Sequence, residues 1–283
     1  MSQRHNSRLP LARLLLPAAL CAVALLVLVA RAGAETLPTL SLTFTKTSVT
    51  VGTPPQSGGV NVVASATATK EASAILFLLK PGATVAEVEA FLHSPLAKDP
   101  NNAAKFGAIV FDAEVTPGQK SETQTSLAAG QYLVLKGEGE GAPAVLGKFT
   151  VTAAASPTML PAPAATVRSI EFGFRGPKVL HDGELVRFEN EGFLVHMDVA
   201  IPAKSHADAL KIEKDLLNGK EKGIEKLAGG QPFEFAGPLS WGAYQQETIT
   251  AKPGWYVQAC FMETQDGRDH TRLGMERVIR IVK

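Results

Sequence analysis

The chain has 283 residues, with 28 lysines and arginines against 27 aspartates and glutamates. This near balance excludes the strongly basic surface with which proteins neutralise nucleic-acid phosphates, so we expect no nucleic-acid partner. The length suits two domains of ordinary size. No His-Glu-x-x-His, Cys-x-x-Cys or P-loop pattern occurs, which leaves the commonest metalloprotease, dithiol and nucleotide sites without support.

The first 34 residues have the pattern of a secretory signal peptide. Arg4, Arg8 and Arg13 precede an apolar run over residues 14–30, and small residues at 32–34 form a cleavage site. We therefore expect an exported protein, either secreted or periplasmic. The alternative is an uncleaved anchor, because the run is almost long enough to span a bilayer, and the segment would then be the protein's membrane contact. Cleavage leaves 24 basic and 27 acidic residues, a net charge of −3.

Residues 35–152 predict a first β-rich domain. Gly, Pro and polar clusters separate its short β-prone runs. A turn and a helical stretch ending near residue 92 interrupt these runs. Residues 153–166 are rich in Pro and Ala and predict an extended linker. The β-prone runs are residues 41–45, 60–63, 74–79, 132–135 and 147–151.

Residues 167–283 predict a second domain of the same kind. One helical stretch, roughly residues 205–228, interrupts it, and Gly219 and Gly223 are expected to break that helix in two. Strand–turn–helix segments begin near residues 79 and 201, which suggests an internal duplication of roughly 120 residues and hence tandem domains. The β-prone runs are residues 169–174, 185–189, 195–201, 246–250, 255–261 and 278–282.

Cys260 has no intramolecular disulfide partner after cleavage, because the other cysteine, Cys21, lies in the signal segment. A leftover cysteine in an exported chain suggests an intermolecular disulfide, a reactive thiol or a metal ligand. The remaining alternative is an inert buried side chain. His270 and Met275 follow on the same short stretch, and His196 begins an upstream strand. Imidazole, thiolate and thioether are the ligand types that hold mononuclear copper in electron-transfer proteins.

The pattern in this half resembles the cupredoxins, the plastocyanin and azurin family of blue copper proteins. The resemblance covers about residues 167–283 and implies an antiparallel β-sandwich with Greek-key connections. It implies that His196, Cys260, His270 and Met275 bind copper. Hydrogen bonds around the ligands would fix the imidazole tautomers, and Asn190, in the turn that leads to His196, is a candidate contributor. The matching pieces are Phe188-x-Asn190-x5-His196, Tyr256-x3-Cys260, His270-x4-Met275 and the final strand.

We therefore predict an all-β protein of two tandem Greek-key cupredoxin-like β-sandwiches, each with a short helical insertion. Residues 35–152 would be a degenerate copy without metal ligands. Alignment of the two halves places no soft ligand opposite the four candidates. The opposing residues are Ala74, Lys136, Pro143 and Lys148.

The spacing departs from the family pattern, because nine residues separate Cys260 from His270 where blue copper proteins have fewer. Asp266-Gly267 predicts a turn, so this stretch can return as a hairpin that brings His270 back and leaves Cys260 outside the site. A thiolate-free copper site of His196, His270 and Met275 is therefore an alternative, as is no metal at all.

The signal-peptide pattern predicts export. The resemblance implies a copper-binding protein that transfers electrons through a mononuclear site and meets a redox partner protein. With four positions filled, no open position remains for a substrate, so we expect no enzyme. The alternatives are a metal-free structural or protein-binding module with a structural partner, and copper storage or delivery through a His/Met site.

Overall fold

The computed structural model describes residues 36–67, 72–139 and 141–283, which belong to one compact unit. The predicted signal peptide, residues 1–34, lies outside the described residues. Within the described ranges, no helix combines the length and apolar character needed to cross a membrane.

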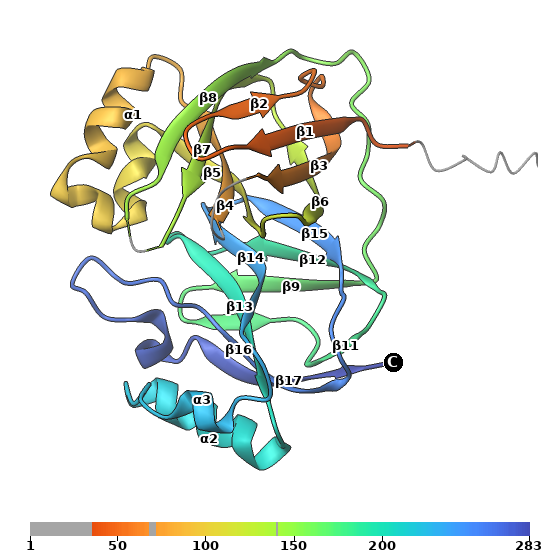
Figure 1. The fold of residues 1–283 in the computed structure, drawn as a ribbon, viewed down its shortest axis with the longest axis vertical. Helices are drawn as coiled ribbons and strands as arrows, with labels where there is room; N and C mark the ends of the chain where they lie inside the picture. The colour runs from red at the N-terminus through yellow and green to blue at the C-terminus, as the bar shows by residue number, and fades with distance from the viewer. Residues whose placement is uncertain (1–35, 68–71, 140) are drawn as a thin grey trace, which may run out of the picture. The chain divides into compact units, whose positions relative to one another are not determined.

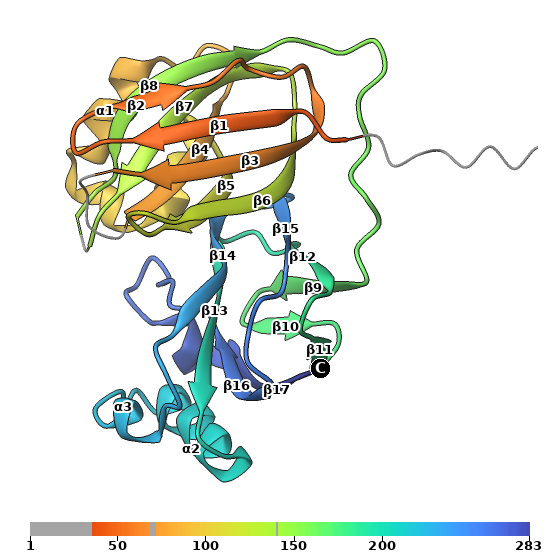
Figure 2. The ribbon, with the colours of Figure 1, turned by 45° about the vertical axis from the view of Figure 1, so that its right-hand side comes forward.

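The predicted all-β fold of two tandem β-sandwiches is confirmed. The first half pairs strands in the order β2-β1-β3-β6 in one layer and β5-β4-β7-β8 in the other (Figures 1 and 2). The elements are β1 (Thr39–Phe44), β2 (Val49–Val51), β3 (Gly58–Ala66), β4 (Ala72–Leu79), α1 (Val85–Leu92), the 3₁₀ helices η1 (Pro95–Lys98) and η2 (Pro100–Lys105), β5 (Gly107–Val115), β6 (Lys120–Leu127), β7 (Gly130–Gly137) and β8 (Ala144–Val151).

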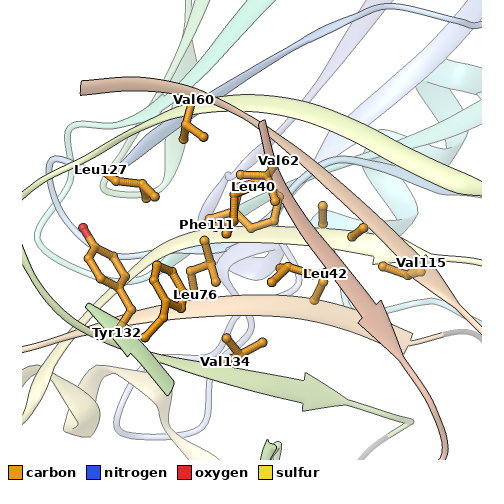
Figure 3. Close-up of a cluster of buried hydrophobic side chains, with 14 of the residues drawn as sticks. Leu40, Leu42, Val60, Val62, Leu76, Phe111, Val115, Leu127, Tyr132 and Val134 are labelled. Carbon is orange, nitrogen blue, oxygen red and sulfur yellow. The ribbon is translucent and has the colours of Figure 1, made fainter. Parts of the chain in front are cut away.

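The core of the first half follows the two-residue period of its strands. Leu40 and Leu42 of β1 are completely buried, whereas the intervening residue is exposed. They meet Leu76 of β4 and Val134 of β7, which come from the opposite layer (Figure 3). Apolar side chains from two sheets thus interdigitate, as in other sandwiches.

The second half repeats the strand order of the first. Its layers are β10-β9-β12-β15 and β11-β17-β16-β13-β14. β9 and β12 run parallel, as β1 and β3 do. The elements are β9 (Ala165–Ile170), β10 (Gly173–Arg175), β11 (Val179–His181), β12 (Leu185–Asn190), β13 (His196–Ala203), α2 (His206–Leu217), α3 (Ile224–Leu227), β14 (Phe233–Leu239), β15 (Tyr244–Thr248), β16 (Gly254–Ala259), the 3₁₀ helix η3 (His270–Leu273) and β17 (Glu276–Val282).

One eight-stranded sheet runs through both halves, because β15 pairs antiparallel with β6 (Figure 1). Gln245 lies opposite Thr125, and Gln246 lies opposite Gln124. The Gln246 Nε2 atom donates to Gln124 Oε1 at 2.9 Å. The predicted domain boundaries and the degenerate origin of the first half stay predictions.

Both predicted helical insertions are present. The second is divided into α2 and α3, as expected, and Gly219 and Gly223 both have positive φ angles between them. The single strand predicted over residues 169–174 is wrong, because a tight turn separates β9 from β10. Phe172 in this turn has a φ of 57°, in the left-handed region that breaks a strand.

Candidate metal centre

Three elements of one sheet bring the candidate ligands to the same end of the second sandwich. His196 is the first residue of β13, Cys260 directly follows β16, and Met275 directly precedes β17. β16 pairs with both β13 and β17, so these residues are neighbours through the sheet. His270 begins η3, the short helix between β16 and β17.

The structure brings His196, Cys260 and His270 together around one point. The two Nδ1 atoms of the imidazoles are 3.1 Å apart. The Cys260 sulfur lies 3.4 Å from Nδ1 of His270 and 3.8 Å from Nδ1 of His196. All three side chains are buried, with at most 1% exposed. Among the described residues, these three form the cluster of His, Cys and acidic side chains close enough to share an ion.

Met275 is placed by its backbone against the other two loop residues. Its N–H donates to the carbonyl of His270 at 3.0 Å, and its own carbonyl accepts from the N–H of Cys260 at 3.1 Å. The side chain is completely buried. These contacts fix the residue beside the cluster, and its role as a fourth ligand stays a prediction.

The nine residues between Cys260 and His270 contain the predicted turn, but β16 ends at Ala259 instead of continuing past Cys260, and Cys260 is not left outside the cluster. The Gly267 N–H donates to the carbonyl of Thr264 at 2.8 Å and closes the turn. The His270 N–H donates to the carbonyl of Met262 at 2.8 Å, which closes the base of the excursion. The additional residues therefore project away from the site while its two flanking ligand candidates stay in contact.

The donor separations fit a single metal ion. Metal–nitrogen bonds are about 2.0 Å and metal–thiolate bonds about 2.3 Å, so two donors on one ion lie at most about 4.3 Å apart. The three observed separations, 3.1, 3.4 and 3.8 Å, all fall within this limit. A soft thiolate with two imidazoles in a site closed to water suits copper.

The protonation states of the donors follow from their burial. Burial raises the pKa of the Cys260 thiol to about 12, so the sulfur must lose a proton to bind a metal. Burial and the neighbouring His270 lower the pKa of His196 to about 4. Burial also lowers the pKa of His270. Both imidazoles are therefore neutral near pH 7, the form that ligates metals.

Asn190 organises the loop before His196, although it does not contact the imidazole. Its Nδ2 donates to the carbonyls of Leu194 and Leu239, both at 2.7 Å. Its Oδ1 accepts from the N–H of Gly192 at 2.8 Å. Asn190 therefore bonds the backbone of the loop, and a role for it in fixing the tautomer of His196 stays a prediction.

Sequence reasoning missed three residues at this site. Glu171 and Phe172, in the turn between β9 and β10, face the two imidazoles. Asn101 comes from η2 in the first half, and its Oδ1 accepts from the N–H of Val195 at 2.6 Å. No local sequence pattern predicts the turn that carries Glu171 and Phe172, because phenylalanine is not a residue type that predicts a left-handed turn. The contact of Asn101 with Val195 joins the two halves of the chain, so a local sequence pattern does not predict it.

No protein-family model and no curated protein matches the chain. Auracyanin A, a blue copper protein from Chloroflexus aurantiacus, is 20% identical over 41% of this chain and 96% of its own, with a TM-score of 0.25. A copper-containing nitrite reductase from Thermus scotoductus is 14% identical over 87% of this chain and 68% of its own, with a TM-score of 0.25. A multicopper oxidase is 10% identical over 86% and 88%, with a TM-score of 0.24. At these scores the likenesses are distant, so the functional assignment rests on the chain's own donor atoms.

Proposed function

We propose that this protein is an exported, cupredoxin-like electron carrier that binds one copper ion in its second half. His196, Cys260 and His270 would bind the ion, with Met275 as a weak fourth ligand. The observation that carries the proposal is the convergence of two Nδ1 atoms and one sulfur, from three separate elements, within 3.1–3.8 Å in a buried site.

The donor set favours electron transfer because it can bind copper in both of its oxidation states. When bound, copper would supply a one-electron couple, and a ligand set of imidazoles, thiolate and thioether suits both of its states. The chain holds the donors in place with the sheet and with backbone bonds among residues 260, 270 and 275. The Met197 N–H also faces the Cys260 sulfur at 3.4 Å, where it would stabilise a thiolate.

The same arrangement supports a carrier rather than an enzyme. Three ligand side chains are buried and a fourth would complete the set, so a substrate would have no open position. Exchange of electrons would then require a partner protein. The signal-peptide pattern at residues 1–34 supports export of the chain before it meets that partner.

Copper loading of the mature chain tests this proposal. We expect one copper(II) per chain and an intense visible charge-transfer band from a copper–thiolate bond, which disappears reversibly on one-electron reduction. Cys260→Ser is the matched control, because it keeps the size of the side chain and removes the thiolate. It should abolish the band.

Other outcomes identify the alternatives. A band that survives in Cys260→Ser would exclude this cysteine as the ligand. Bound copper with only a weak spectrum would favour a His/Met storage or delivery site. Absence of stoichiometric copper would favour a metal-free structural module. Consumption of oxygen or nitrite by the copper-loaded protein would contradict the role of carrier.

A further inference from the structure

The turn between β9 and β10 places a charge against one ligand imidazole and an aromatic ring against the other. Glu171 Oε1 lies 3.7 Å from Nε2 of His196, the nitrogen remote from the metal cluster. The Phe172 ring meets the His270 ring edge-on, with centroids 5.2 Å apart. The two imidazoles, which look equivalent in the sequence, therefore have different surroundings.

The backbone of the turn explains how consecutive residues reach the same site. Successive side chains of a strand point to opposite faces of the sheet. Phe172 breaks this alternation with a φ of 57°, the sole positive φ at a non-glycine residue within the described ranges. Such a conformation is costly for a bulky residue and persists where the surroundings enforce it, often at functional sites.

Two features of the loop before His196 favour this placement of the Glu171 carboxylate. The Leu194 N–H donates to the same Oε1 atom at 3.1 Å. Gly192 keeps the space between the two groups open, because a Cβ there would lie 2.6 Å from Glu171 Oε1 and 2.7 Å from His196 Nε2. The Leu194 N–H thus holds the carboxylate, and the absence of a side chain at Gly192 leaves it free to face the remote nitrogen of His196.

We propose that Glu171 is a positioning residue that orients His196 and makes the centre favour copper(II) over copper(I). This inference rests on the proposed copper site. A ligating histidine commonly directs its second ring nitrogen to a carboxylate, which fixes the tautomer and strengthens the ligand. His196 Nε2 has no hydrogen-bond partner in the structure, and the nearby negative charge of Glu171 favours the more positive oxidation state.

The test compares the reduction potentials of copper-loaded wild type and Glu171→Gln. Glutamine keeps the shape of the side chain and an oxygen for Leu194, but removes the charge. The Glu171 carboxylate is one imidazole ring away from the proposed copper position. At an intermediate dielectric, we expect loss of its charge to lower the ratio of copper(II) affinity to copper(I) affinity about tenfold. For a one-electron couple, this change raises the potential by about 59 mV.

Glu191→Gln is the matched control. Glu191 pairs with Arg168 at 2.9 Å on the surface nearby, so its loss removes the same formal charge without changing the contact to His196. For Glu191→Gln we expect the ratio of copper(II) affinity to copper(I) affinity to change less than about twofold, because exposed charges are screened. The dissociation constants of copper(I) and copper(II) are measured for all three proteins with competing chelators.

The outcomes separate this inference from the proposed function. Failure of the wild type to bind copper would overturn both. A wild type that binds copper, with a Glu171→Gln potential within the range of the control, would overturn the role of Glu171 alone. So would equal weakening of both oxidation states. Selective loss of copper(II) affinity in Glu171→Gln, including complete loss with copper(I) binding retained, supports it.

Discussion

Loading the proposed centre with zinc is expected to release one proton per ion at neutral and mildly alkaline pH. Zinc is a suitable probe because it has no redox chemistry and cannot oxidise the thiol. The proton comes from Cys260, whose thiol burial keeps protonated with a pKa of about 12. His196, with a pKa lowered to about 4, and His270, whose pKa is also lowered, are already neutral imidazoles, so metal binding displaces no proton from them.

The magnitude follows from this proton count. The thiolate is the form that binds metal, so the ion competes with one proton, and a lower proton concentration favours the ion. Apparent affinity should therefore rise about tenfold, or about 1.4 kcal/mol, for each pH unit between about pH 7 and pH 9. The rise would end only where the thiol ionises by itself.

Isothermal titration calorimetry in buffers of different ionisation enthalpy counts the released protons directly. At one pH, the slope of the observed enthalpy against the buffer enthalpy should correspond to one proton for wild type. Cys260→Ser should give a slope near zero, since a serine hydroxyl keeps its proton. A wild-type slope of zero, or the same slope in both proteins, would refute the assignment of a buried protonated thiol as ligand.

Three further predictions concern the loop before His196 and a buried carboxyl group of the first half. Asn190→Ala should lower the free energy of unfolding by about 3 kcal/mol in urea titrations, because it leaves buried backbone groups without partners. Gly192→Ala should weaken metal binding about tenfold or more in chelator competition, because its Cβ would displace the His196 ring. Burial and the charge of Glu234 raise the pKa of Asp112 well above its usual range, so wild-type stability should fall as pH rises through that pKa. Asp112→Asn should remove this loss and be the more stable protein at pH 8, as measured by thermal unfolding.

The sequence was informative where function depends on local spacing. The strands next to His196 and Cys260 show alternating or continuous apolar patterns. The motifs Tyr256-x3-Cys260 and His270-x4-Met275 indicated the site, although the gap between Cys260 and His270 departs from the family spacing. The divided helix after β13 was also predictable, because Gly219 and Gly223 are strong helix breakers. The fate of Cys260 was open, since only the contact between His270 and Met262 shows how the hairpin closes.

The remaining features depend on contacts that no local pattern encodes. Most residues of β6 are polar, yet the side chains of Thr123 and Thr125 are buried. Gln245 and Gln246 of β15 are also buried, with at most 1% exposed, where the two edge strands meet. Polar residues on an edge strand predict solvent exposure, and only the structure shows that another strand pairs with that edge. The Glu171 turn was missed for a related reason, because tertiary contacts hold Phe172 in a conformation that its residue type disfavours.

The first half takes part in the architecture of the candidate metal centre, even though its own sheets contribute no donor to the cluster of His196, Cys260 and His270. Asn101 holds the N–H of Val195, the residue directly before the ligand candidate His196. Ser240, at the end of β14, exchanges hydrogen bonds with Ile109 of β5, from its N–H to the Ile109 carbonyl and from the Ile109 N–H to its Oγ, both at 2.9 Å. An isolated second half would lose these bonds and expose the polar edge of β15. The two halves therefore stabilise one site together, and the loop before His196 owes its position to both of them.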